Sequence, residues 1–389
     1  MMKRIIHIVS LVLIILIPSG CMKKEEVPVC NDGSMVLTFI TIGKGDAFLL
    51  HSPEGKHYLI DTGKRSDFPQ IARTLKIKNI ETLDGIFLSH GHLDHAGGLE
   101  SILDAFSVKK IYLSAVDSIS YQNIDAEAIA KEHNVPIEKI SGGDVLTGEE
   151  MSIRSWIPEK AVIDNENNNS VILRISYGKT AFLMMGDAEL EEETDLLYSG
   201  ESLRADILKL GHHGENDATS LSLLKKVKPQ YGLVTGNQEE NPDSLNSDVS
   251  AKLSSIGTTP VYSESDGLGI DFCSDGKHIT TRTVNDQAPP VDTPLILLGS
   301  DREKQRIEVK NTGTESVDLG GYTLFSKRGG EVFRFSNNTL LPPGESITVS
   351  CRSTWREGEL LWDEDKVWKK NDEACLYDRD FVLLDELMN

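Results

Sequence analysis

The sequence has no excess of basic residues. Its 389 residues include 40 Lys and Arg against 61 Asp and Glu, a formal net charge of −21. An acidic chain repels polyanions at long range, which argues against a broad basic groove for nucleic acid. Apolar residues still make up 39% of the chain, enough for a sizeable core. The length suits two domains of roughly 100–200 residues each.

The apolar run near the start, Ile5–Ile17, is too short for a membrane span, which takes about 20 residues. It follows Lys3 and Arg4 and has the length of a signal-peptide core. Small residues then precede Cys21, and this arrangement resembles a bacterial lipoprotein signal with Cys21 as the lipid-modified residue. We therefore expect a signal peptide at 1–20, a tether at 21–33 and a lipid-anchored protein on the extracellular face of the membrane. An ordinary signal peptide and a secreted protein are the alternative.

Cysteine is scarce, with five in the chain. Besides Cys21 there are four, whose spacing fits no zinc ribbon, and an even number in an oxidising compartment favours disulfides. One pairing compatible with their positions joins Cys30 to Cys273 and Cys351 to Cys375, although the sequence does not establish it.

Residues 34–283 alternate short apolar segments with helical patterns, which is typical of an α/β domain. The expected strands are Met35–Ile42, Ala47–His51, His57–Asp61, Gly85–Ser89, Lys110–Leu113, Ser170–Ser176, Thr180–Met185 and Ile207–Leu210. The expected helices are Pro69–Leu75, His95–Phe106, a Glu-rich segment after residue 187, and Ser220–Val227.

Residues 284–293 have no apolar periodicity and are expected to form a linker. Residues 294–389 alternate strand patterns with turn residues, which predicts an all-β, immunoglobulin-like sandwich. The run RIEVKNTGTESVDLGGYTLFSKRGGEVFRFSNNTLLPPGESITV and the later NDEACLYD resemble a lamin-tail domain. Nothing in this part has a catalytic pattern, so we expect it to bind substrate or the cell surface.

The segment LSHGHLDHAGG places His90, His92, Asp94 and His95 within six residues, between an apolar strand and a helix. A turn there lets His90 and His92 ligate one metal ion while Asp94 and His95 face a second. Imidazole and carboxylate ligands suit zinc, manganese or iron. Five of the ten histidines lie in this segment and one other, which argues against a chance cluster.

The pattern H-x-H-x-D-H resembles the metallo-β-lactamase fold, an αββα sandwich, and further motifs of that family follow in order. YLIDTG supplies Asp61, the family's carboxylate behind the metal-binding loop, and FLMMGDAE supplies Asp187, its bridging carboxylate. LKLGHHG supplies His212 and His213. The resemblance implies that His212 is a metal ligand and that His213 lines the pocket.

The motifs TIGKGDAFLL, NNNSVILRISYGKTAFLMMGDAE and ILKLGHHG are most similar to the C-terminal hydrolase domain of the competence protein ComEC. Many enzymes of the fold carry a third ligand histidine, and here Asn169 is expected in its place, which favours manganese or leaves one metal ion loosely held. Asp46 and Lys44 lie in the loop that enters the site in ComEC-like domains. Lys44 replaces the usual Gln, and Glu215 replaces the usual Ser after His-His-Gly.

These residues predict a monomeric metal-dependent hydrolase with two divalent ions, Mn or Zn. Two such ions can clamp a phosphodiester and activate water, with Asp94 and Asp187 orienting the water and His213 assisting the leaving oxygen. The favoured substrate is DNA or RNA, because the ComEC-like domain is thought to degrade nucleic acid. Cell-wall phosphocholine or small nucleotides are the rival substrates, and a non-enzymatic surface-binding module is the third possibility.

Overall fold

The computed structural model describes residues 30, 33–116, 123–237, 244–264, 267–286, 292–301 and 303–388. The expected signal peptide, the lipidation site Cys21 and most of the tether lie outside these residues. Among the helices of the described residues, none is long and apolar enough to cross a membrane.

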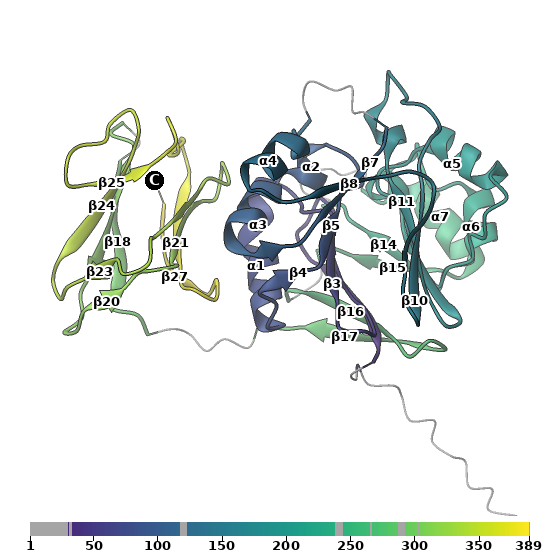
Figure 1. Cartoon of the computed structure of the whole chain (residues 1–389), viewed down its shortest axis with the longest axis horizontal. Coiled ribbons are helices and arrows are strands. Elements are labelled where there is room, and N and C mark those ends of the chain that lie inside the picture. The colour runs from purple at the N-terminus through teal and green to yellow at the C-terminus, as the bar shows by residue number, and fades with distance from the viewer. Residues whose placement is uncertain are drawn as a thin grey trace, which may run out of the picture.

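Two mixed sheets form the centre of the first domain (Figure 1). In spatial order, the first sheet contains β17 (Ile279–Val284), β16 (Gly269–Ser274), β1 (Met35–Ile40), β2 (Phe48–His51), β3 (His57–Ile60), β5 (Gly85–Phe87), β7 (Ile111–Ser114) and β8 (Ile137–Ile140). The second contains β15 (Thr259–Tyr262), β14 (Tyr231–Val234), β13 (Ile207–Lys209), β12 (Thr180–Met184), β11 (Ile172–Tyr177), β10 (Met151–Trp156) and β9 (Gly143–Thr147). A small pair, β4 (Thr82–Leu83) and β6 (Ser107–Val108), lies apart.

Helices cover the outer face of each sheet. The first sheet is covered by α1 (Phe68–Ile77), α2 (Leu93–Ala96), α3 (Leu99–Ala105) and α4 (Ala126–Glu132). The second is covered by α5 (Leu190–Tyr198), α6 (Leu221–Val227) and α7 (Ser247–Ile256). Three 3₁₀ turns complete the domain: η1 (Arg65–Asp67), η2 (Glu166–Asn169) and η3 (Gly211–Gly214).

Successive side chains of a strand point to opposite faces of its sheet. Each sheet therefore contacts one apolar layer on its inner face and another on its outer face. Phe39 and Phe48 of the first sheet meet Phe182 of the second in the layer between the sheets. Leu49 and Leu59 face the other way, toward α1 and α3. Burying each such side chain contributes roughly 1.5–3 kcal/mol. The layers confirm the expected αββα sandwich.

The predicted helix at 95–106 was wrong in one respect, because the structure contains two short helices, α2 and α3, interrupted at Gly97 and Gly98. At Gly98 a Cβ atom would lie 2.3 Å from the Thr62 carbonyl oxygen. The Gly98 amide donates instead to the Gly63 carbonyl. The interruption therefore allows the chain after β3 to pack closely against the end of the histidine motif.

The second domain is a β-sandwich, as expected. One sheet orders β18 (Leu295–Asp301), β19 (Arg306–Asn311), β24 (Ser346–Cys351) and β25 (Leu360–Trp362). The other orders β22 (Val332–Arg334), β21 (Thr323–Ser326), β26 (Glu373–Tyr377) and β27 (Leu383–Met388), with a small pair β20 (Val317–Asp318) and β23 (Leu340–Leu341). Trp362 and Trp368 are buried between the two sheets.

The sandwich docks on the helices of the first domain through Phe381. Its ring lies edge-on to Phe68 of α1, with 5.1 Å between centroids, and 6.4 Å from Phe106 after α3. Arg73 of α1 donates to the Asp380 carbonyl at 3.1 Å, and Arg65 of η1 pairs with Glu364 at 3.0 Å. The docked face is therefore the helical side of the first sheet.

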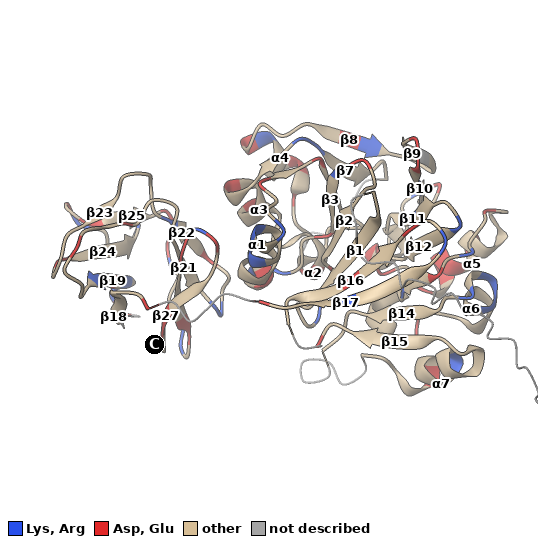
Figure 2. Cartoon of the chain, turned by 90° about the horizontal axis from the view of Figure 1, so that it is seen from below, with Lys and Arg blue, Asp and Glu red and all other residues tan. Residues whose placement is uncertain are grey.

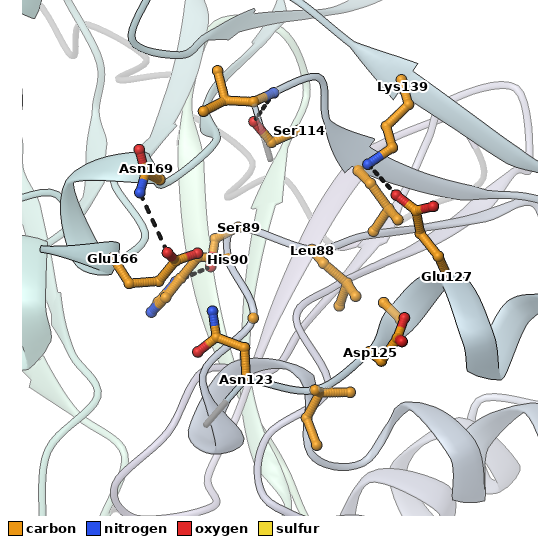
Figure 3. A pocket seen from close by; sticks show the side chains of 15 residues that line it. Leu88, Ser89, His90, Ser114, Asn123, Asp125, Glu127, Lys139, Glu166 and Asn169 are labelled. Carbon is orange, nitrogen blue, oxygen red and sulfur yellow. Dashed lines mark hydrogen bonds and ion pairs between the residues drawn. The ribbon is translucent and has the colours of Figure 1, made fainter. Parts of the chain in front are cut away.

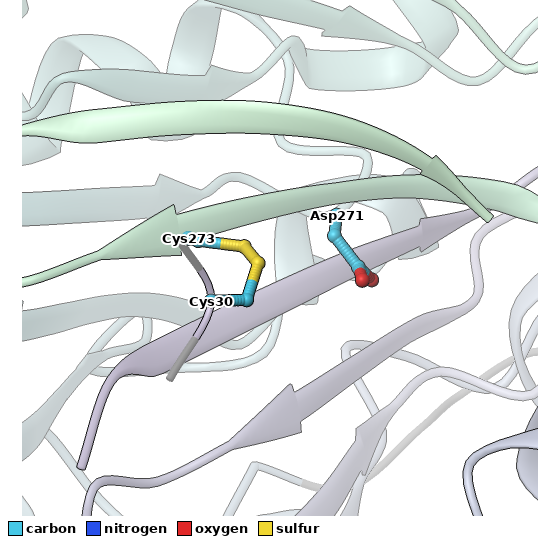
Figure 4. Close-up of side chains that lie close together, drawn as sticks. All are labelled: Cys30, Asp271 and Cys273. Carbon is cyan, nitrogen blue, oxygen red and sulfur yellow. A yellow bond between two sulfur atoms is a disulfide. The ribbon is translucent and has the colours of Figure 1, made fainter. Parts of the chain in front are cut away.

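One of the two proposed disulfides is confirmed and the other is wrong. Cys30 is bonded to Cys273 of β16, which ties the segment before β1 to the sheet (Figure 4). Cys351 and Cys375 are both buried free thiols. Cys351 belongs to the core of the sandwich, and so do Ala374 and Leu376 on either side of Cys375. Because side chains alternate along a strand, Cys375 points away from that core and cannot meet Cys351.

Candidate metal centre

The residues of the histidine and aspartate motifs come together at the ends of strands from both sheets. His90 follows β5, Asp61 follows β3, Asp187 follows β12, and His213 follows β13 in η3. Parallel strands end at a common edge, so residues far apart in the sequence share one site.

Two histidine side chains converge on Asp187. The Oδ2 atom of Asp187 lies 3.1 Å from His95 Nε2 and 3.2 Å from His213 Nε2. His213 Nε2 is also 3.3 Å from Asp94 Oδ2. Both imidazole Nε2 atoms are buried and make no hydrogen bond of good geometry. Buried lone pairs directed at shared carboxylates are what a divalent cation requires, so this donor set fits a metal ion.

A second group surrounds His90. His90 Nε2 lies 3.0 Å from His92 Nδ1, and the rings of His90 and His95 are 4.2 Å apart. His90, His95 and Asp187 each offer a ligand atom within 4.8 Å of the others. A second cation would therefore be held by His90 and His92, with Asp187 shared between the two positions.

The Asn169 side chain is engaged by hydrogen bonds to its own loop. Its Oδ1 accepts from the Val162 amide at 2.8 Å, and its Nδ2 donates to the Val162 carbonyl at 3.1 Å and to Glu166 at 3.3 Å. The amide therefore secures the loop before η2, which contradicts its predicted role as third ligand. The position of His90 and His92 consequently has fewer ligands than the position of Asp94, His95 and His213.

Asp61 holds the histidine motif from behind. Its carboxylate accepts from the Ser89 amide and hydroxyl, both at 2.7 Å, and faces His95 Nδ1 at 2.9 Å. A carboxylate on Nδ1 orients the ring so that Nε2 is presented to a metal. The structure thus places Asp61 in the supporting position that the family resemblance implied.

Lys209, which the sequence analysis did not assign to the metal centre, is fully buried within it. Its ammonium lies 2.8 Å from Asp46 Oδ2 and 3.1 Å from Asp187 Oδ1, and donates to the Gly186 carbonyl at 2.6 Å. It therefore occupies one Asp187 oxygen and leaves the other to the histidines. The sequence did contain an indication of this role, because Lys209 lies inside the apolar strand β13 and a buried lysine needs charged partners.

The histidine pair is arranged opposite to the expectation. His213 is the buried member that contacts Asp94 and Asp187, and its Nδ1 is 2.9 Å from Thr235 Oγ1. His212 Nδ1 instead faces Asp217 at 3.0 Å. Both histidines have positive φ, 41° and 55°, so the backbone makes a left-handed turn that directs the second ring inward. Neighbouring histidines in a sequence do not show which of the two this turn will select.

The pKa shifts within the cluster favour the binding of a cation. Burial lowers the pKa of His90 well below its ordinary value, so this ring is neutral and able to ligate. Burial would also lower the pKa of His95, but the carboxylates of Asp187 and Asp46 raise it well above the ordinary value. Burial opposes ionisation of Asp187, but His213, His95 and Lys209 hold its pKa well below the usual range. Cation binding would displace a proton, so affinity should rise with pH.

A cavity of about 480 Å³ opens beside His90. Its wall includes Ser89, Asn123, Glu166 and Lys139 (Figure 3). The cavity adjoins the less completely ligated metal position.

Comparison with known proteins agrees with this geometry. The metallo-beta-lactamase superfamily profile matches residues 40–235, half of the chain, and the lamin tail domain profile matches residues 278–387. The chain therefore belongs to the metallo-beta-lactamase superfamily, as a metal-dependent hydrolase with a C-terminal lamin tail domain.

Within that superfamily the chain is related to competence proteins, which confirms the ComEC-like resemblance. It is 25% identical over 226 residues to ComE operon protein 3 of Bacillus subtilis (54% of this chain, 29% of the relative). It is 27% identical over 206 residues to Recombination protein 2 of Haemophilus influenzae (51% and 24%) and 26% identical over 215 residues to competence protein ComA of Neisseria gonorrhoeae (55% and 28%). The chain spans less than a third of the length of each of these relatives.

Among solved structures, the chain is similar to the metallo-beta-lactamase fold protein YhfI of Bacillus subtilis. The TM-score is 0.42 at 15% identity, covering 62% of this chain and all of YhfI. The metal-dependent hydrolase Tm1679 gives a TM-score of 0.41 at 13% identity, covering 59% of this chain and 95% of Tm1679.

Proposed function

We propose that this chain is an extracellular, membrane-tethered phosphodiesterase that cleaves DNA or RNA. The observation that carries the proposal is the buried convergence of Asp94, His95, Asp187 and His213, with two imidazole nitrogens left without hydrogen bonds. Two relatives support a polynucleotide substrate, because their names refer to competence and recombination.

Two bound divalent cations, Mn or Zn, would supply Lewis acidity and lower the pKa of water. The chain's own residues hold the reacting groups in place. Asp187 presents Oδ2 to both histidines because Lys209 binds Oδ1. Asp61 keeps the His95 ring oriented, and Asp46 holds the Lys209 ammonium. Because His213 lies inside this cluster, it acts as a ligand rather than as the expected proton donor.

The extracellular location rests on two features of the chain. The Cys30–Cys273 disulfide is typical of oxidising compartments. The sequence before Cys21 resembles a lipoprotein signal, and a lipid at Cys21 would tether the domain through the segment that the disulfide anchors. The lamin tail domain would then contact substrate or the cell surface, with the protein acting as a monomer.

The net negative charge of the chain limits how strongly it would bind nucleic acid through phosphate contacts. In Figure 2 acidic positions mark α5, and basic positions mark α1 and α6. Lys209, the lysine nearest the metal centre, is buried between carboxylates and cannot contact a phosphate. Few phosphates would therefore be neutralised by the protein, and DNA affinity should decrease only shallowly with salt.

The decisive experiment combines metal analysis of the purified protein with four substrates: DNA, RNA, bis-p-nitrophenyl phosphate and a choline phosphodiester. After chelation we expect Mn²⁺ or Zn²⁺ to restore nucleic-acid cleavage. Asp187→Ala should lower turnover by more than about 100-fold, because even residues behind metal ligands contribute 10–100-fold. Asp195→Ala, which removes an exposed carboxylate from α5, is the matched control.

Full activity of Asp187→Ala would refute the metal assignment. Hydrolysis of the choline ester, with DNA and RNA left intact, would refute the nuclease and favour the cell-wall alternative.

A further inference from the structure

A second group of metal-ligand side chains lies outside the metal centre described above. Glu189 directly precedes α5, His212 lies in η3, and Asp217 follows η3. One ligand atom of each residue lies within 4.8 Å of the other two. His212 is the histidine that the left-handed turn leaves outside the metal centre, so the two groups have no side chain in common.

The spacing of these atoms suits a divalent cation. His212 Nδ1 lies 3.0 Å from Asp217 Oδ1 and 3.7 Å from Glu189 Oε1. Zinc lies about 2.0–2.2 Å from nitrogen and oxygen ligands, which places neighbouring ligand atoms roughly 2.8–3.6 Å apart in octahedral or tetrahedral geometry. A cation between the three residues would therefore require only small movements of their side chains.

Hydrogen bonds from η2 and the residue before it hold Glu189 in this position. Asn165 Nδ2 donates to Glu189 Oε2 at 2.6 Å, and Asn167 Nδ2 donates to Glu189 Oε1 at 2.8 Å. The Leu190 amide donates to the Asp217 carbonyl at 2.9 Å, which fixes the loop after η3 against the start of α5. Each carboxylate oxygen has a second lone pair for a metal ion, and outer partners of this kind orient metal ligands.

The side-chain oxygen of Asn167 is an independent indication of a ligand at this place. Asn167 Oδ1 is buried and makes no hydrogen bond of good geometry with the described residues. The nitrogen of the same amide lies 3.4 Å from His212 Nε2 and 2.8 Å from Glu189 Oε1, so the amide lies between the two ligands. A buried oxygen without a partner is a place where an ion or a bound water is expected. A cation between His212 and Glu189, or a water bound to it, would supply that partner.

Charge and exposure also favour a cation here. In the part of the chain that the structure describes, no lysine or arginine forms an ion pair with Glu189 or Asp217, and His212 is the basic side chain that contacts both. The side chains of Glu189 and His212 are 17% and 19% exposed, and that of Asp217 is 41% exposed. Solvent therefore reaches one side of the group, where water can complete the coordination of a metal ion.

We infer that Glu189, His212 and Asp217 form a third divalent-cation site, which prefers zinc to calcium or magnesium because one of its ligands is an imidazole. The cation joins the start of α5 to η3 and to the loop after η3. It thereby fixes the turn that directs His213 into the metal centre, so its role is structural. The inference concerns an ion outside the catalytic pair and does not depend on which substrate the enzyme cleaves.

Zinc titration of the chelated full-length protein, measured by calorimetry and by metal analysis, tests this site. We expect the parent protein to bind one zinc ion more than the two of the metal centre. Asp217→Ala should lose this additional ion or bind it more than about tenfold more weakly, while the other two ions remain. Asp195→Ala, which removes an exposed carboxylate from α5, is the matched control and should bind zinc as the parent does.

His212→Asn is the second variant, because Asn tolerates the positive φ of this position. It should lose the same ion, since the imidazole is the nitrogen ligand of the site. In Asp187→Ala, zinc at the metal centre should weaken while the additional ion stays bound, and adding Asp217→Ala should then remove it.

Three results would overturn the site. The first is a parent protein that binds no zinc beyond the metal centre, even at millimolar zinc. The second is equal zinc binding by the parent, Asp217→Ala and His212→Asn. The third is loss of an ion in His212→Asn but not in Asp217→Ala, which would place His212 in the metal centre instead. None of these results bears on the nuclease, whose test uses Asp187→Ala and the nucleic-acid substrates.

Discussion

The Lys44 ammonium lies 3.7 Å from Glu215 Oε1, and both side chains are about three-quarters buried. These are the two positions at which the chain departs from the ComEC-like pattern, where Gln and Ser are usual. One precedes Asp46 and the other follows His213 and Gly214, so the pair joins two loops of the metal centre. The two substitutions are therefore partners, and the charge that Lys44 adds is offset by Glu215.

This pair predicts opposite effects of its two members on DNA cleavage. Lys44→Ala should lower kcat/KM for DNA by roughly two- to fivefold, and Glu215→Ala should raise it, in keeping with the ~0.2–1 kcal/mol of a partly exposed pair. Neither change should alter cleavage of bis-p-nitrophenyl phosphate as much. The double variant should return close to the parent. A decrease in DNA cleavage in Glu215→Ala equal to that of Lys44→Ala would contradict an electrostatic role.

The arrangement of the two histidines predicts different metal binding by their variants. His213→Ala should weaken the tighter cation by more than about 100-fold, because it removes a ligand that contacts both Asp94 and Asp187. His212→Ala should change that affinity by less than about tenfold, since its ring faces Asp217. Calorimetric titration of the chelated protein with Mn²⁺ and Zn²⁺ measures both. The reverse order would restore the assignment that the family resemblance implied.

Docking of the tail through Phe381 predicts a loss of stability without a loss of catalysis. Phe381→Ala should lower the free energy of unfolding by roughly 3 kcal/mol, as for other buried Phe truncations. Turnover of bis-p-nitrophenyl phosphate should be unchanged, because the metal-centre residues all precede Val284. A chain ending at Val284 should also retain this activity. Its complete inactivity in a folded state, judged by circular dichroism, would mean that the tail contributes to the site.

Glu192 predicts a pH dependence of stability. Burial raises the pKa of this α5 carboxyl well above its ordinary value of 4.5, and neither oxygen has a hydrogen bond of good geometry. The folded state keeps a proton that the unfolded chain loses above about pH 4.5, so stability decreases as pH rises from there through the folded pKa.

Glu192→Gln removes this dependence and should stabilise the protein at pH 7–8, by about 1.4 kcal/mol for each unit of the pKa shift. Below pH 4, where both states are protonated, the advantage should disappear. Denaturant unfolding across this pH range measures the effect, with exposed Glu191→Gln as the control. An equal advantage at all pH values would show that packing, not titration, is responsible.

The sequence by itself determined the parts of this protein that depend on local spacing. His90, His92, Asp94 and His95 are recognisable because six consecutive residues contain the whole motif. Short apolar segments separated by helical patterns predicted an α/β first domain, and strand patterns separated by turn residues predicted the β-sandwich. The Cys30–Cys273 disulfide was only one possibility among several, because four cysteines allow three connectivities.

Only the tertiary structure decided which side chains meet. A left-handed turn directs His213 inward and leaves His212 with Asp217. Strand alternation separates Cys351 from Cys375, although spacing alone allowed them to pair. Lys209 on β13 likewise pairs with Asp187, which follows the neighbouring strand β12. Such contacts depend on the order of strands in the sheet and on the backbone angles of single residues. At the histidine pair, those angles decide which of two adjacent side chains points to the metal centre and which points away from it.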